Sequence, residues 1–184
     1  MIKNSIMKKI LLMAAFAVAT LTANAQVWVG GALGFDYEKS TGFDAKTQFT
    51  LAPSVGYNFS DKWAIGLDLS FSFGSTGVGV VNPNPLKTQD ILVSPYARFT
   101  FARAGVASFF VDGGFGVGSH KVGNANAEVM YTIGFRPGVA FGVNEHCSFV
   151  ATTGYLGFRH TDGYNHFGLN ANNQLASVGF FYTF

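Results

Sequence analysis

The chain is poor in charge, in cysteine and in long apolar runs. Only 12% of its 184 residues are charged, whereas soluble proteins typically carry about 25%. The single cysteine, Cys147, cannot close an internal disulfide, so other interactions must hold the fold. Low charge together with 20 Phe residues argues against a disordered chain and against a nucleic-acid partner, and the length suits one domain.

The one continuous apolar run lies at the N-terminus, where residues 1–25 read as a secretory signal peptide. Its basic segment holds three lysines, Lys3, Lys8 and Lys9. The apolar segment Ile10–Leu21 has 12 residues, and a helix that spans a bilayer needs about 20. The alternative, an N-terminal anchor helix, is therefore too short. Ala23–Ala25 forms an A-x-A cleavage site, and Gln26 follows where a lipoprotein would have cysteine.

Removal of this leader changes the charge balance. The leader holds three of the 12 basic residues and none of the ten acidic ones, which leaves nine basic residues against ten acidic ones. The domain formed by residues 26–184 is therefore close to neutral, and no basic patch remains to indicate a phosphate-rich partner.

After Gln26 the apolar residues stand at every second position. From Trp63 to Phe73 the odd positions are large and apolar, while the even positions are Ala, Gly, Ser and Asp. This period of two over eleven residues matches a tilted strand that crosses a bilayer. Similar segments recur along the chain, at 27–37, 49–59, 63–73, 91–101, 109–117, 129–141, 148–158 and 176–184. The seventh alternates poorly, and its phase stays open.

The opposite face of these segments is small or polar and holds few charges, which is the reverse of a soluble sandwich. We therefore predict an all-β fold, an eight-stranded antiparallel up-and-down transmembrane β-barrel with its apolar face in lipid. Short turns at 60–62, 102–106 and 144–146 alternate with longer connections at 38–46, 74–89, 119–127 and 159–173. This places the short turns and both termini in the periplasm, and four loops outside.

Three prolines recur at one point of the repeat. Pro53, Pro95 and Pro137 lie 42 residues apart, on every second predicted strand. Proline lacks the N–H that a strand ladder needs. We therefore expect a bulge or a gap in the ladder at each proline.

The last strand ends in alternating apolar residues and a terminal aromatic, Phe180, Tyr182 and Phe184. This pattern resembles the C-terminal signature of bacterial outer-membrane barrels, which the barrel-assembly machinery reads. The segments 53–71 and 94–98 are also similar to the small porin-family outer membrane protein β-barrel domain of Bacteroidetes-type bacteria, an OmpA/OmpX-like barrel. The resemblance implies the bacterial cell outer membrane as location, with its lipids and lipopolysaccharide as surroundings.

Four charges fall on the inward face of four consecutive strands. They are Asp68, Arg98, Asp112 and Arg136, all at similar depth. The first interpretation is a structural salt-bridge network in a filled barrel, because eight strands leave an interior just wide enough for side chains. The alternative is a charged constriction or gate.

Aromatic residues gather near the predicted strand ends, where they fit two interfacial girdles better than a ligand cage. The last loop holds His160, Asp162 and His166, which could bind a metal only if the loop folded over it. The stretch around His160 is similar to the histidine region of lipid A deacylases, but Asp162 replaces their nucleophilic serine. We predict no catalytic residue, no metal and no cofactor.

The sequence thus predicts a monomeric, non-enzymatic outer-membrane barrel whose four loops serve structure, adhesion or surface contact. A small channel for solutes is the alternative, and a lipid A-modifying enzyme is the third hypothesis.

Overall fold

The structure is a computed structural model that describes residues 26–38, 46–75, 86–161, 164–170 and 177–184. The predicted signal peptide lies outside these residues. The described residues form ten strand segments and contain no helix long and apolar enough to cross a membrane. The strands are β1 (Val27–Glu38), β2 (Lys46–Asn58), β3 (Trp63–Ser75), β4 (Lys87–Ala104), β5 (Ala107–Val122), β6 (Glu128–Gly142), β7 (Cys147–Thr152), β8 (Tyr155–Thr161), β9 (Tyr164–Asn170) and β10 (Ser177–Thr183).

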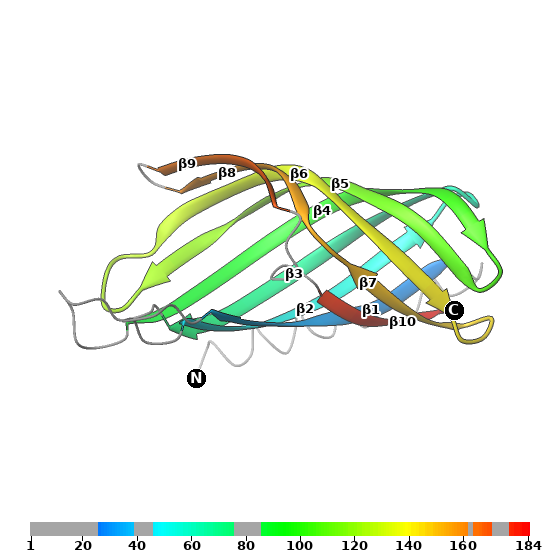
Figure 1. Ribbon diagram of the computed structural model, residues 1–184, viewed down its shortest axis with the longest axis horizontal. Helices are drawn as coiled ribbons and strands as arrows, with labels where there is room; N and C mark the ends of the chain where they lie inside the picture. The colour runs from blue at the N-terminus through cyan, green and yellow to red at the C-terminus, as the bar shows by residue number, and fades with distance from the viewer. Residues whose placement is uncertain (1–25, 39–45, 76–85, 162–163, 171–176) are drawn as a thin grey trace, which may run out of the picture.

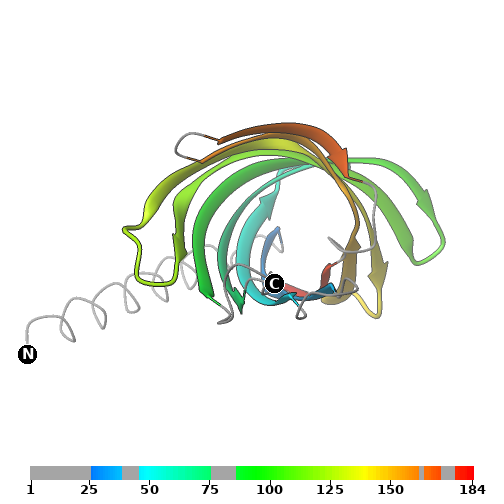
Figure 2. The ribbon, with the colours of Figure 1, turned by 60° about the vertical axis from the view of Figure 1, so that its left-hand side comes forward.

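Eight of these strands close into a ring. Each of β1 to β6 pairs antiparallel with the next strand, and β10 pairs with both β7 and β1. Figure 1 shows the strands tilted along the long axis, and Figure 2 shows them curving round the interior. The predicted eight-stranded antiparallel barrel is therefore confirmed.

The two ends of the barrel differ in their connections. At one end, which we call the turn end, residues 59–62, 105–106 and 143–146 join consecutive strands, and the chain finishes there at Phe184. Gly105 has a φ of 57°, a left-handed conformation that suits glycine in a tight hairpin turn. The opposite end, the loop end, carries the described connection 123–127, and the segments 39–45, 76–85, 162–163 and 171–173 of the predicted longer loops lie outside the described residues.

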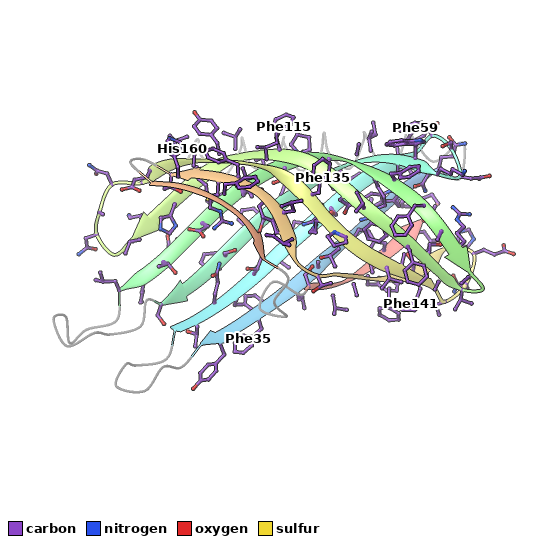
Figure 3. The ribbon with its side chains drawn as sticks, turned by 45° about the horizontal axis from the view of Figure 1, so that its top comes forward. Phe35, Phe59, Phe115, Phe135, Phe141 and His160 are labelled. Carbon is purple, nitrogen blue, oxygen red and sulfur yellow. The ribbon has the colours of Figure 1, made fainter. Side chains whose placement is uncertain are left out.

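Burial alternates with the predicted phase. Along β3 the odd positions are mostly exposed, with Ile65 at 53%, while Ala64, Asp68 and Ser72 on the other face are buried. The labelled side chains of Phe115, Phe135 and Phe141 point away from the ribbon in Figure 3. An exposed apolar exterior around a partly polar interior is the arrangement that lipid requires.

The predicted seventh strand is broken, which explains its poor alternation. Val150 and Thr152 of β7 face inward at even positions, whereas Tyr155 and Arg159 of β8 line the interior at odd positions. The break lies at Thr153 and Gly154, and Gly154 has a φ of 72°. A shift of one residue moves every following side chain to the other face, so no single phase fits this segment.

The predicted last loop, 159–173, is largely a β-hairpin instead. Strand β8 runs to Thr161 and pairs with β9, in a register that places His160 opposite Asn165. Strand β8 also pairs with the loop-end half of β6. The hairpin of β8 and β9 therefore extends the barrel wall beyond the end of β7.

Each of the three repeated prolines stands at a gap in the ladder, as predicted. Strands β2 and β3 pair at Leu51 and again at Ser54, so the pairing skips Pro53. The same omission occurs at Pro95 between β4 and β5, and at Pro137 where the partner of β6 changes from β7 to β8. On its other side each proline is paired regularly. The missing N–H of each proline therefore interrupts the hydrogen bonds to one neighbouring strand only, and the ring stays closed.

Candidate functional site

The turn-end half of the interior is filled by large side chains. Trp28, Tyr96, Phe110, Val150 and Phe181 form a buried cluster, which we call the plug. Trp28 packs edge-on against Phe181, with ring centroids 4.9 Å apart. The expectation that the inward face holds only small or polar residues is therefore wrong at this depth. The plug fills the space that an open pore would need.

Every aromatic residue of the plug stands directly opposite a glycine on the neighbouring strand. The four register pairs are Trp28 with Gly56, Tyr96 with Gly66, Phe110 with Gly138 and Phe181 with Gly30. A Cβ on Gly56 would lie 2.1 Å from Cζ2 of Trp28, and one on Gly138 would lie 2.4 Å from Cζ of Phe110. Glycine at these positions provides the room in which each ring lies across its partner strand.

The four predicted charges lie together on the plug. The Arg98 guanidinium donates to both carboxylate oxygens of Asp112, from Nε at 2.7 Å and from Nη2 at 2.9 Å. Arg136 stands opposite Asp112 on the neighbouring strand β6, and its Nη2 donates to Asp112 at 3.5 Å and to Asp68 of β3 at 2.9 Å. Asp68 also accepts a hydrogen bond from the Ser54 hydroxyl. We call these four residues the charge network.

Arg98 joins the charge network to the plug. Its guanidinium carbon lies 3.8 Å from the ring centroid of Phe110, and the rings of Trp28, Tyr96 and Phe181 lie within about 6 Å. A guanidinium stacks favourably on aromatic faces when water is excluded. Plug and network therefore form one packed unit.

Beyond this unit, the loop-end half of the interior is hollow. A cavity of about 320 Å³ lies there, with the charge network among its lining residues. Its wall combines apolar side chains, among them Phe35, Leu92 and Phe115, with a set of Ser and Thr residues: Thr50, Ser54, Ser70, Ser72, Ser94, Thr132 and Thr152. A second, polar hollow of about 310 Å³ lies at the turn end and is lined in part by Asn58, Thr100 and Arg103. Arg98 lines both.

One interior contact, between a histidine and an aspartate, was missed by the sequence reasoning. His120 contacts Asp90 across β4 and β5, with Nδ1 and Oδ1 2.5 Å apart. The sequence predicts a loop over 119–127, but β5 continues to Val122 and keeps its alternation. The even positions of this strand face inward at Asp112, and extending that alternation through Gly118 predicts that His120 also faces inward.

The histidines of the last predicted loop do not assemble into a described site. His160 stacks on Tyr131 with centroids 6.2 Å apart, and its Nδ1 lies 2.6 Å from Oδ1 of Asn165. His166 stands opposite Arg159 in the β8–β9 register, whereas His160 stands opposite Asn165, so the two histidines are not register partners. Asp162 lies outside the described residues. Among the residues that the structure does describe, no group of three or more His, Cys, Asp or Glu could hold a metal.

The three residues of the predicted C-terminal signature lie at the turn end. Phe180 and Tyr182 belong to β10 and are partly exposed on the outer face. Tyr182 packs edge-on against Phe184 and stacks on His146, and Phe180 meets Phe149. The role of this signature in barrel assembly stays a prediction.

A closed antiparallel ring with an apolar exterior and a packed polar interior defines the class of bacterial outer-membrane β-barrels. The family described as "Outer membrane protein beta-barrel domain" matches residues 10–184. The chain belongs to this family, and its location is the bacterial outer membrane.

Comparison with solved structures finds a match with a TM-score above 0.5 and further matches below that value. Neisserial surface protein A is 16% identical, with a TM-score of 0.54 over 88% of this chain and 98% of that one. OprG from Pseudomonas aeruginosa is 14% identical, with a TM-score of 0.46 over 86% of this chain and 94% of that one. A bacterial polysaccharide outer membrane secretin is 20% identical, with a TM-score of 0.46 over 88% of this chain and 52% of that one. No curated protein matches the sequence.

Proposed function

We propose that this protein is a non-enzymatic outer-membrane scaffold that holds its loop end at the cell surface for structure, adhesion or surface contact. The observation that carries the proposal is the plug with Arg98 and Asp112 packed on it, because this unit fills the turn-end half of the interior. A barrel filled in this way supplies rigidity, and specificity then resides in the loops.

The proposal includes the surroundings of the barrel. The turn end faces the periplasm, and the apolar exterior meets membrane lipids and lipopolysaccharide. The barrel-assembly machinery reads Phe180, Tyr182 and Phe184 during biogenesis, and the folded protein is a monomer. The name of Neisserial surface protein A, whose fold is similar, supports a surface role.

A small channel is the second candidate function, and one observation favours it. Arg98 lines both the loop-end cavity and the turn-end hollow, so its side chain helps to divide the two spaces. In this hypothesis the charge network is a gate. A lipid A-modifying enzyme has less support, because His160 is engaged with Tyr131 and Asn165.

Conductance of the Arg98→Ala variant in planar bilayers separates the two. If the barrel is a scaffold, the variant melts at a lower temperature than the unaltered protein, because Asp112 loses its bidentate partner. It gains little conductance, because the rings of the plug remain. A large, stable conductance would contradict the scaffold and support the gate. Gel mobility with and without boiling shows that each sample contains folded barrel.

A further inference from the structure

The loop-end cavity has the size and position of a ligand site. Its volume of about 320 Å³ lies at the lower end of the roughly 300–1,000 Å³ of small-molecule pockets. The plug closes it toward the turn end. A ligand that occupies it must therefore be compact and must enter from the loop end or from the side.

The wall of the cavity offers hydroxyl groups on several strands. Ser70, Ser94 and Thr132 line it from β3, β4 and β6. Thr50 and Ser72 also line it, with their oxygens hydrogen-bonded to each other at 2.8 Å. Hydroxyl groups can both donate and accept, so this wall suits a ligand that is itself rich in hydroxyls.

At the floor of the cavity lies Arg136, an arginine of which only some hydrogen-bond donors have acceptors. Arg136 keeps 37% of its side chain exposed, against 14% for Arg98. Of its five N–H donors, those on Nη2 alone have acceptors among the described residues, and the buried Nε has none. The side chain lines the cavity, so its open surface faces the space in which a ligand would lie.

A second arginine reaches the same cavity from β8. Arg159 lines it and is exposed, and its side chain makes no hydrogen bond or ion pair with any side chain that the structure describes. Asp68 and Asp112 are already engaged by Arg136 and Arg98. The described lining thus contains three arginines and two aspartates, an excess of one positive charge.

We propose that the loop-end cavity binds a compact organic anion that carries several hydroxyl groups, of the class of sugar acids and sugar phosphates. The anionic group lies at Arg136 and Arg159, and the hydroxyls lie along the Ser and Thr wall. Guanidinium groups bind carboxylate and phosphate through paired hydrogen bonds. An apolar ligand would leave these donors without acceptors, and a cation would be repelled by them. The site is independent of whether the barrel conducts.

Titration calorimetry on the full mature protein, refolded in a nonionic detergent, tests the site with glucuronate as the probe. Glucose is the matched uncharged ligand. We expect saturable binding of glucuronate and at least about tenfold weaker binding of glucose, because one charge-assisted contact accounts for that factor. Equal affinities for the two sugars would overturn the proposal.

Two variants remove one positive charge each and differ only in its place. Arg159→Gln removes it from the cavity wall, and we expect glucuronate affinity to fall about tenfold or more. Lys121→Gln removes it from an exposed position of β5 that does not line the cavity, and affinity should stay the same. Equal losses in both would mean general charge attraction and would overturn the site. Arg159 lies outside the charge network, so its variant is expected to fold.

The anion could be a free solute or the sugar acid and phosphate head group of lipopolysaccharide. Competition distinguishes these sources: displacement of glucuronate by purified lipopolysaccharide in the same detergent identifies the head group. Glucuronate binding that lipopolysaccharide leaves unchanged identifies a free solute. Both results support the site, whereas failure of glucuronate, glucose 6-phosphate and lipopolysaccharide alike to bind the unaltered protein overturns it.

Discussion

The two halves of the barrel interior are built on the same strands and yet are opposite in character. In the turn-end half, four aromatic rings lie on four glycines and support the bidentate pair of Arg98 and Asp112. In the loop-end half, Ser and Thr side chains line a cavity of about 320 Å³ together with Leu92, Tyr155 and Arg159. The size of the inward side chains decides how far each section of the interior is filled.

This difference indicates how the protein combines stability with recognition. Packing and paired buried charges concentrate at the turn end, where loss of any partner leaves a void or an unpaired ion. The loop end keeps hydroxyls and an under-used Arg136 open to a cavity. Substitutions in the two halves should therefore have very different costs.

The largest effect is expected for Asp112→Ala. This change leaves Arg98 buried over Phe110 without its bidentate partner and removes an acceptor of Arg136. We expect a loss of about 3–5 kcal/mol in the free energy of unfolding, measured by denaturant titration with gel mobility as readout. Asp61→Ala, in the β2–β3 turn, is the control and should unfold like the unaltered protein. Equal stability of the Asp112 and Asp61 variants would show that the network does not hold the barrel.

An intermediate effect is expected for Gly56→Ala. The added Cβ would meet the Trp28 ring and the backbone oxygen of Ile65 well inside contact distance. Overpacking of this kind costs about 1–3 kcal/mol, read from the same titration. Gly142→Ala is matched in chemistry, but its Cβ would come no closer than 3.8 Å to the oxygen of Val106. An equal loss of unfolding free energy in the two variants would show that the close packing of aromatic rings against glycines does not stabilise the turn end.

The smallest effect is expected in the hollow half. Thr50→Val removes a hydroxyl that pairs with Ser72 beside the cavity, and the loss should be at the low end of about 0.5–1.5 kcal/mol. Water in the cavity can take the place of the lost partner, which keeps the cost small. Thr50→Ser retains the hydroxyl and serves as control in the same unfolding measurement. A loss as large as that of Gly56→Ala would mean that the two halves contribute alike to stability.

Much of the fold was predictable because it follows from local chemistry. In a closed barrel, lipid outside and a narrow interior impose a period of two on each strand, so the alternation predicted the all-β class and eight-stranded ring. The missing N–H of proline predicted the ladder gaps at Pro53, Pro95 and Pro137. The inward parity of Asp68, Arg98, Asp112 and Arg136 could also be read from the chain.

The sequence by itself determined which face of each strand meets lipid, how many strands close the ring and which charges point inward. Only the tertiary structure decided their partners: Arg136 reaches Asp68 across the barrel, from a strand that does not pair with β3. It also decided the register that sets each plug ring on a glycine, and the phase shift at Thr153 and Gly154. These features join residues far apart in the chain, and they depend on strand stagger and barrel width, which no local pattern contains.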